Sequence, residues 1–150
     1  MPLNLHIRPA LADEASMLAE LRVEAMRPSL EAINRFDPIR ARERFLSTFT
    51  DKETFIICYQ HEIVGFYVLR DFPTYLYLDH FYIKNQFQGK GVGKEVVQRI
   101  QQKARHPGKA IRLIALKASP ANDFYRALGF MFERAEGVDN HYIWPYVDAE

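Results

Sequence analysis

The chain has 150 residues, of which 48% are hydrophobic and 26% charged, as expected for a single soluble globular domain spanning residues 1–150. The net charge of +1 predicts neither nucleic-acid nor membrane binding by the chain as a whole. The only cysteine, Cys58, excludes a disulfide within the chain. The first residues do not resemble a signal peptide, and no apolar run approaches the ~20 residues that span a bilayer, so a cytoplasmic location is expected.

The first fifty residues predict one strand and two helices. Leu3, Leu5 and Ile7 alternate with polar residues, which indicates a half-buried strand that stops at Pro9. The apolar spacing becomes helical over residues 10–26. We expect Pro28 to interrupt this helix. A second helical stretch, over residues 29–50, is expected to break near Asp37-Pro38.

The rest of the chain predicts six strands and two helices. Strands over residues 54–60 and 63–70 are expected to join in a tight hairpin at His61-Glu62. The strand over residues 74–84 is apolar on both faces, which is typical of a central strand. A glycine-rich turn then precedes a helix over residues 91–105. A strand over 111–116, a short helix over 120–128, and strands over 130–135 and 141–147 follow.

This order of elements predicts an α/β fold. Antiparallel hairpins come first and a strand-helix-strand crossover follows, so the sheet should be mixed in direction. We expect about seven strands, mostly antiparallel, with helices on both faces of the sheet.

The turn before the third helix is the main candidate for a binding site. It reads Gln88-Gly89-Lys90-Gly91-Val92-Gly93 and is followed by Lys94. The first amides of a helix lack intrahelical partners and carry the positive end of the helix dipole, and glycines let the backbone approach an anion closely. The turn therefore suits a pyrophosphate, although a glycine-rich turn without a ligand remains an alternative.

Two common phosphate-binding motifs fit this turn poorly. A P-loop requires Ser or Thr after Gly-Lys, but Glu95 follows Gly93-Lys94. The dinucleotide-binding fingerprint requires G-x-G-x-x-G and an acidic residue about 20 positions later, but the turn reads G-x-G-x-G. Neither class of site is favoured.

A third pattern, Q/R-x-x-G-x-G/A, matches at Gln88, Gly91 and Gly93. Here the chain resembles the GNAT superfamily of acyl-CoA-dependent N-acetyltransferases. The resemblance implies that main-chain amides of the turn hold the pyrophosphate of acetyl-CoA. The cofactor-binding residues implied in this way are Gln88, Gly89, Lys90, Gly91, Val92, Gly93 and Lys94.

A second region supports the resemblance. Asn122, then Tyr125, then Leu128-Gly129-Phe130 are similar to a later motif of the same family. The order of elements also matches, so the resemblance spans essentially the whole chain and is weakest over residues 27–50. No cluster of His, Cys and carboxylate residues has metal-ligand spacing, and no metal is expected.

The resemblance also assigns roles in the chemistry. Main-chain groups of Phe81 and Ile83 are expected to bind the pantetheine arm and the thioester carbonyl. Tyr125 is the candidate general acid, because a phenol with a pKa of about 10 stays protonated at neutral pH and can donate to a leaving thiolate. Asn122, one helical turn earlier, is expected to face the cofactor arm. A packed, hydrogen-bonded tyrosine without a catalytic role is the alternative.

The residues that bind and deprotonate the acceptor amine are less well defined by the sequence. Strand alternation places Tyr75, Tyr77 and Asp79 on one face and His80 on the other. By resemblance the first face looks into the acceptor site, with Asp79 as candidate base and Tyr75 and Tyr77 as lining residues. Pairing of Asp79 with an Arg or Lys, a role for His80 after a β-bulge, and a water chain are the alternatives.

The predicted function is transfer of an acetyl group from acetyl-CoA to a primary amine of a small molecule or peptide. A non-catalytic acyl-CoA sensor is the main alternative. An acyl hydrolase has little support, because the chain has no G-x-S-x-G motif and Cys58 lies within a predicted strand. The identity of the amine and the formation of a homodimer stay open.

Overall fold

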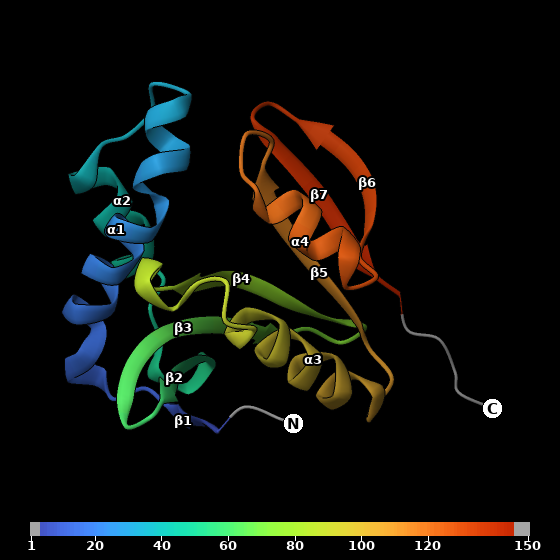
Figure 1. Ribbon diagram of the computed structural model, residues 1–150. Coiled ribbons are helices and arrows are strands. Elements are labelled where there is room, and N and C mark those ends of the chain that lie inside the picture. The colour runs from blue at the N-terminus through green and yellow to red at the C-terminus, as the bar shows by residue number, and fades with distance from the viewer. Residues whose placement is uncertain (1–3, 146–150) are drawn as a thin grey trace. The chain divides into compact units, whose positions relative to one another are not determined.

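Seven strands and four α-helices follow one another in the expected order in the computed structural model, which describes residues 4–145 (Figure 1). The strands are β1 (Leu5–Pro9), β2 (Thr54–Tyr59), β3 (Glu62–Asp71), β4 (Tyr75–Ile83), β5 (Ala110–Leu116), β6 (Met131–Glu136) and β7 (Asp139–Trp144). The helices are α1 (Ala15–Ala32), α2 (Pro38–Leu46), α3 (Val92–Arg105) and α4 (Ala121–Ala127). Short 3-10 turns are η1 (Ala12–Glu14), η2 (Asp51–Glu53) and η3 (Asn85–Phe87).

The strands form one sheet in the order β1-β2-β3-β4-β5-β7-β6. Strand β4 pairs in parallel with β5, whereas β1 with β2, β2 with β3, β5 with β7 and β6 with β7 pair antiparallel. The prediction of a mixed, mostly antiparallel sheet of about seven strands is therefore confirmed.

The expected interruption at Pro28 is wrong. Helix α1 continues through Pro28 to Ala32, and Arg27 and Glu31 form an ion pair across this stretch with a nitrogen–oxygen distance of 3.2 Å. A proline removes only one helical hydrogen bond, which the surrounding turns of a long helix can tolerate. The break expected near Asp37-Pro38 is confirmed, because Asp37 caps α2 by accepting N–H bonds from residues 39 and 40 at 3.0 and 3.2 Å.

The first hairpin is shifted by one residue from its expected position. Its turn is Gln60-His61, with φ angles of 52° and 66°. Two consecutive left-handed residues make the type I′ turn whose twist matches that of the flanking strands. At the two ends of the chain, Leu3 and Val147 of the predicted terminal strands lie outside the described residues.

The chain divides into two compact units. Unit 1 comprises the residues up to Leu69 together with His80–Val92, and unit 2 comprises Arg70–Asp79 together with the residues from Gly93 onward. Strand β4 contributes residues to both units. The organisation of the chain as a single domain stays a prediction.

In unit 1, α1 and α2 lie side by side (Figure 1) and pack on β2 and β3. The core residues come from α1, α2, β2 and β3 and from the position directly after β1. They are Ala10, Leu18, Ala19, Leu21, Phe45, Ile56, Phe66 and Val68. Phe45 of α2 contacts Phe66 of β3 edge-on, with 5.1 Å between ring centroids. Burial of each large side chain of this kind stabilises the fold by about 1.5–3 kcal/mol.

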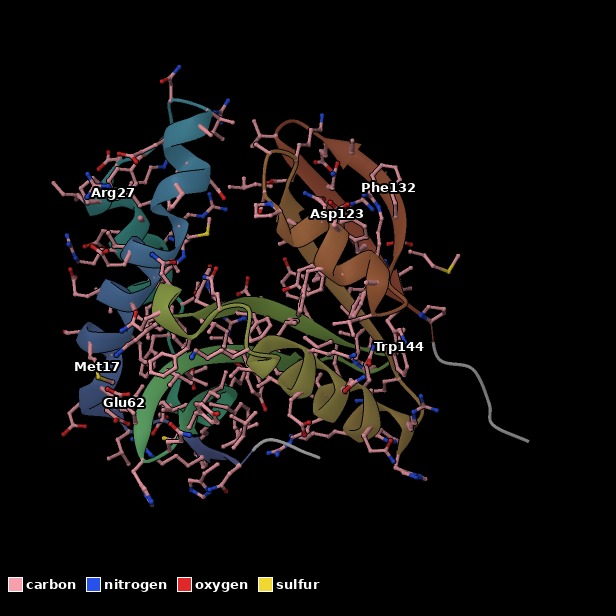
Figure 2. The ribbon with its side chains drawn as sticks, viewed as in Figure 1. Met17, Arg27, Glu62, Asp123, Phe132 and Trp144 are labelled. Atoms are coloured by element: carbon pink, nitrogen blue, oxygen red, sulfur yellow. The ribbon has the colours of Figure 1, made fainter. Side chains whose placement is uncertain are left out.

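In unit 2, α3 and α4 pack together and against β7. Gln101 of α3 donates to the carbonyl oxygen of Leu128 after α4, at 2.8 Å. The guanidinium of Arg105 lies 5.5 Å from the ring centroid of Trp144, which is labelled in Figure 2. The predicted buried stripe of α3 is confirmed by Val92, Val96, Val97, Ile100 and Ala104, each at most 2% exposed.

The side chain of Asn122 ties the β5–α4 loop to β7. Its Nδ2 group donates to the carbonyl oxygens of Leu116 and Ser119 at 2.8 and 2.7 Å. Its Oδ1 atom accepts from Asn140 Nδ2 at 2.9 Å and from the Tyr142 hydroxyl at 2.8 Å. These contacts use both N–H groups and both lone pairs of the amide.

We predict that Asn122→Ala lowers the free energy of unfolding by at least about 2 kcal/mol in urea denaturation, because it leaves the buried Tyr142 hydroxyl and the loop carbonyls without partners. The matched control is Asp123→Ala at the next position of α4 (Figure 2), since its side chain is 94% exposed. We expect the control to change stability by less than about 0.5 kcal/mol. Equal stability of the two variants would contradict a structural role for Asn122.

Candidate functional site

The glycine turn takes the backbone from β4 to the start of α3. Gly89 and Gly91 have φ angles of 76° and 83°, in the left-handed region that other residues rarely adopt. A Cβ atom added at Gly89 would meet no atom within 4 Å, so the backbone angle and not crowding calls for glycine there. Helix α3 begins directly afterwards at Val92. Exposed backbone at a helix start is suited to contact with an anion.

Gln88 braces this turn. Its side-chain amide donates to the carbonyl oxygen of Ile83 at 3.0 Å and to Asn85 Oδ1 at 3.3 Å. The backbone N–H of Lys84 donates to the carbonyl oxygen of Val64 on β3 at 2.8 Å. Because the Gln88 side chain is bonded back to the end of β4, and its backbone N–H donates to the carbonyl oxygen of Asn85 at 3.2 Å, this residue sets the path of the turn.

The cations of the turn are exposed. Lys90 and Lys94 have exposed side chains with no hydrogen bond or ion pair to another described residue. Glu95, the acidic residue of the first turn of α3, is paired with Arg99 at 2.8 Å. Both lysines can therefore add positive charge to that of the helix dipole.

The end of β4 lies very close to β3. A Cβ atom at Gly65 of β3 would collide with the carbonyl oxygen of Tyr82 and with the side chain of Ile83. Glycine at this position permits that approach. Phe81 and Ile83 are both half-buried, and the Ile83 carbonyl is already an acceptor for Gln88.

Tyr125 and Asn122 are both buried on α4, one turn apart as predicted, with exposed fractions of 8% and 6%. The Tyr125 ring contacts the rings of Phe124 and Phe130, with centroids 5.1 and 5.4 Å apart. These contacts fix the position of the phenol ring. Because the protein uses the whole hydrogen-bonding capacity of the Asn122 amide, this side chain can influence a ligand only by holding α4 in place.

Asp79 is ion-paired, as in the alternative stated for it above. Its Oδ2 atom accepts from Nε of Arg70 at 2.9 Å, and the Nη2 atom of Arg70 lies 2.9 Å from the same oxygen. His80 is 8% exposed, and its ring contacts those of Phe45 and Tyr82. The predicted alternation of β4 is confirmed in burial, since Leu76, Leu78 and His80 are buried and the residues between them half-buried.

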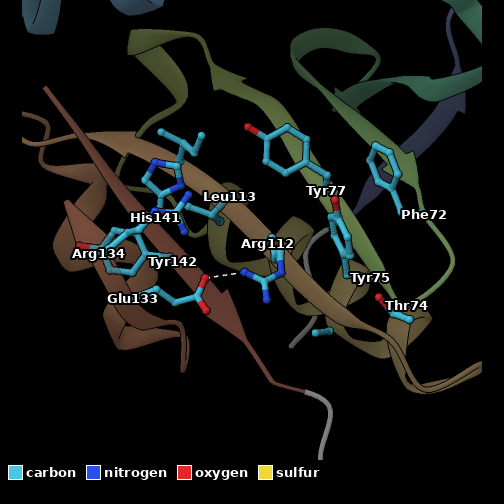
Figure 3. A pocket seen from close by; sticks show the side chains of 12 residues that line it. Phe72, Thr74, Tyr75, Tyr77, Arg112, Leu113, Glu133, Arg134, His141 and Tyr142 are labelled. Carbon is cyan, nitrogen blue, oxygen red and sulfur yellow. Dashed lines mark hydrogen bonds and ion pairs between the residues drawn. The ribbon is translucent and has the colours of Figure 1, made fainter. Parts of the chain in front are cut away.

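A groove of about 610 Å³ lies on the sheet of unit 2 (Figure 3). Tyr75 and Tyr77 of β4 line it together with residues of β5, β6 and β7. Phe72 stacks on Tyr75 with centroids 4.9 Å apart, and the guanidinium of Arg112 lies 5.5 Å from the Tyr75 centroid. An ion pair of 2.5 Å joins Arg112 to Glu133. The groove combines flat aromatic side chains with charged groups, which suits an organic ligand.

Two features of the site were not predicted. Arg112 and Glu133 of the groove come from strands far apart in the sequence, and no local motif marks them. Arg22 is buried and donates to the Tyr82 hydroxyl. Its position, one turn after the buried Leu18 on an apolar helix face, was the available signal. In residues 4–145, no group of three or more His, Cys, Asp or Glu residues could hold a metal ion.

No described helix is both long and apolar enough to cross a membrane. Comparison with curated proteins finds no match. Among solved structures, the PaiA N-acetyltransferase from Thermoplasma acidophilum, in complex with coenzyme A, is 17% identical with a TM-score of 0.79, covering 96% of this chain and 100% of that one. An acetyltransferase from Thermus thermophilus is 19% identical with a TM-score of 0.74, covering 95% of this chain and 97% of that one.

These similarities establish the fold, which the order of elements had predicted. The model of the acetyltransferase (GNAT) domain matches residues 24–145, including the glycine turn, Asn122 and Tyr125. The chain therefore belongs to the GNAT family of acetyltransferases.

Proposed function

We propose that this chain transfers an acetyl group from acetyl-CoA to a primary amine of a small molecule or peptide, by direct attack within a ternary complex. The observation that carries the proposal is the braced glycine turn at the start of α3, with Gly89 and Gly91 at positive φ. The similar structure from Thermoplasma acidophilum contains coenzyme A, which supports the same donor here.

The turn is the proposed site for the pyrophosphate of acetyl-CoA. Backbone N–H groups from Gly89 to Lys94 would donate to the phosphate oxygens, and the side chains of Lys90 and Lys94 would balance their charge. The buried Val92 side chain anchors this end of the helix, with an exposed fraction of 1%. Because backbone N–H groups would bind the anion, little side-chain rearrangement is needed on binding.

The end of β4 is the proposed site for the reactive arm of the donor. Main-chain groups of Phe81 and Ile83 would hold the pantetheine and polarise the thioester carbonyl. The Gln88 brace on Ile83 supports this assignment, because it couples the position of the strand end to that of the phosphate-binding turn.

In the reaction, the amine nitrogen attacks the carbonyl carbon of the thioester, a C–N bond forms, and the C–S bond breaks. Tyr125 is the proposed general acid that protonates the leaving thiolate. Packing of its ring between Phe124 and Phe130 would keep the hydroxyl in a fixed position. The amine must lose a proton, and Asp79 is proposed to draw the ammonium group in or to act on it through a water molecule.

The groove on unit 2 is the proposed location of part of the acceptor, with Tyr75 and Tyr77 as lining residues. Asn122 is proposed to act indirectly, since its amide is saturated by protein groups and its loss would release α4, which carries Tyr125.

We predict that Gly91→Asp weakens acetyl-CoA binding at least about 100-fold in isothermal calorimetry, because the variant places a strained side chain and a negative charge at the phosphate site. The control is Gly137→Asp in the β6–β7 hairpin, where φ is also positive and a Cβ atom would meet nothing within 4 Å. Unchanged acetyl-CoA affinity in folded Gly91→Asp would remove the turn from the donor site.

Replacement of Tyr125 by Phe tests the acid. We expect kcat to fall about 100-fold or more while the Kd for acetyl-CoA changes less than about three-fold, because only the proton donor is lost. The matched control is Tyr67→Phe on β3, which removes the hydroxyl of another buried tyrosine. Tyr67 is 5% exposed. Full turnover by Tyr125→Phe would exclude this residue as the general acid.

A further inference from the structure

Arg22 on α1 is a buried cation without a described counter-ion. Its exposed fraction is 6%. Nε donates to the Tyr82 hydroxyl at 3.0 Å, and Nη1 donates to the carbonyl oxygen of Ala41 on α2 at 2.6 Å. Both acceptors are neutral. Among the described residues, no carboxylate pairs with this guanidinium.

This arrangement differs from that of other arginines in the chain. Eight described arginines in more exposed positions each pair with a carboxylate: Arg8, Arg27, Arg42, Arg70, Arg99, Arg112, Arg126 and Arg134. A buried charge is costly unless it is paired and hydrogen-bonded. A cation kept at a buried position without an anion from the protein therefore suggests that a ligand supplies the anion.

The guanidinium of Arg22 also retains donors for such a ligand. Two of its five N–H groups are used, and Nη2 has no partner among the described residues. Every fully buried side-chain nitrogen or oxygen in the described part of the chain has a hydrogen-bond partner. Nη2 is therefore not fully buried and keeps its N–H groups free of protein acceptors. The planar guanidinium favours a carboxylate as the ligand group.

The position of Arg22 indicates which molecule carries that anion. Tyr82, its hydrogen-bond partner, lies between Phe81 and Ile83, whose main chains form the proposed thioester site. The pantetheine arm next to the thioester is uncharged. The pyrophosphate of CoA is assigned to the turn from Gln88 to Lys94, and the ribose phosphate lies beyond it, at the nucleotide end of CoA. An anion beside the strand end therefore belongs to the acceptor.

We propose that Arg22 binds a carboxylate of the acceptor, so that the substrate class is amines that also carry a carboxylate, as amino acids do, and not polyamines. This inference rests on the proposed acetyl transfer to an amine and identifies its acceptor class. The Arg22–Tyr82–His80 contacts orient the guanidinium, since Tyr82 accepts from Arg22 and its hydroxyl lies 2.9 Å from His80 Nδ1.

The test compares amines that differ only in the carboxylate. Isothermal calorimetry in the presence of saturating CoA would measure binding of phenylalanine against phenethylamine, alanine against ethylamine, and lysine against 1,5-diaminopentane. We expect the carboxylate member of at least one pair to bind about ten-fold or more tightly to the wild type, and Arg22→Met to abolish this ratio. Arg22→Met suits the test because methionine is a long, unbranched side chain that fills much of the same space without the charge.

Arg44→Met, at an exposed position of α2, is the matched control and should keep the wild-type ratio. Arg22→Lys keeps the charge, and we expect it to retain part of the preference for the carboxylate member of each pair. It replaces Arg22→Met in the test if circular dichroism shows that Arg22→Met does not fold. Absence of a carboxylate preference in the wild type, or its persistence in folded Arg22→Met, would overturn the proposal. If the wild type does not bind CoA, the proposed donor site is wrong instead. Failure of the Arg22 proposal and failure of the proposed function are therefore distinguishable.

Discussion

The connection between β4 and α3 depends on a backbone bend that only glycine adopts easily. Gly89 and Gly91 both lie in the left-handed region, and the Gln88 amide holds the bend against the Ile83 carbonyl. Beside this bend, Lys90 and Lys94 are exposed and have no hydrogen bond or ion pair to another described residue. The proposed roles of the strand end, of Tyr125 and of the acceptor groove all presuppose a donor anchored at this bend.

Two buried polar side chains differ in how many of their donors and acceptors are hydrogen-bonded to the protein. Every donor and acceptor of the Asn122 amide has a protein partner, so this residue fixes α4 to β7. Only two of the five N–H groups of Arg22 have protein partners, and Arg22 has no described counter-ion. A saturated amide is explained by stability alone. Arg22 also contributes to stability, through Ala41 and the Tyr82 ring, but its remaining N–H groups and missing counter-ion are the features from which we infer binding.

Local patterns predicted most of the fold. Alternation, helical spacing and turn residues predicted the order of elements, and the glycine turn and α3 stripe lie where expected. Pro28 was misjudged because the rest of α1 supports the helix through it. The turn of the first hairpin was predicted one residue too late. Gln60 and His61 have positive φ angles, which glutamine and histidine rarely adopt, so their residue types gave no signal for a turn. The contacts of Asn122 with β7 and the Arg112–Glu133 pair join segments about 20 residues apart, which no single-sequence pattern reveals. The Arg70–Asp79 pair is one of the alternatives that the sequence left open.

The most direct test of acetyl transfer is a turnover assay with acetyl-CoA and a panel of amino acids, peptides, aminoglycosides and polyamines, in which released CoA thiol and acetylated amine are both quantified. We expect thiol release that depends on an amine and matches the N-acetylated product one to one. Binding of acetyl-CoA without amine-dependent thiol release from any acceptor would contradict it and favour an acyl-CoA sensor.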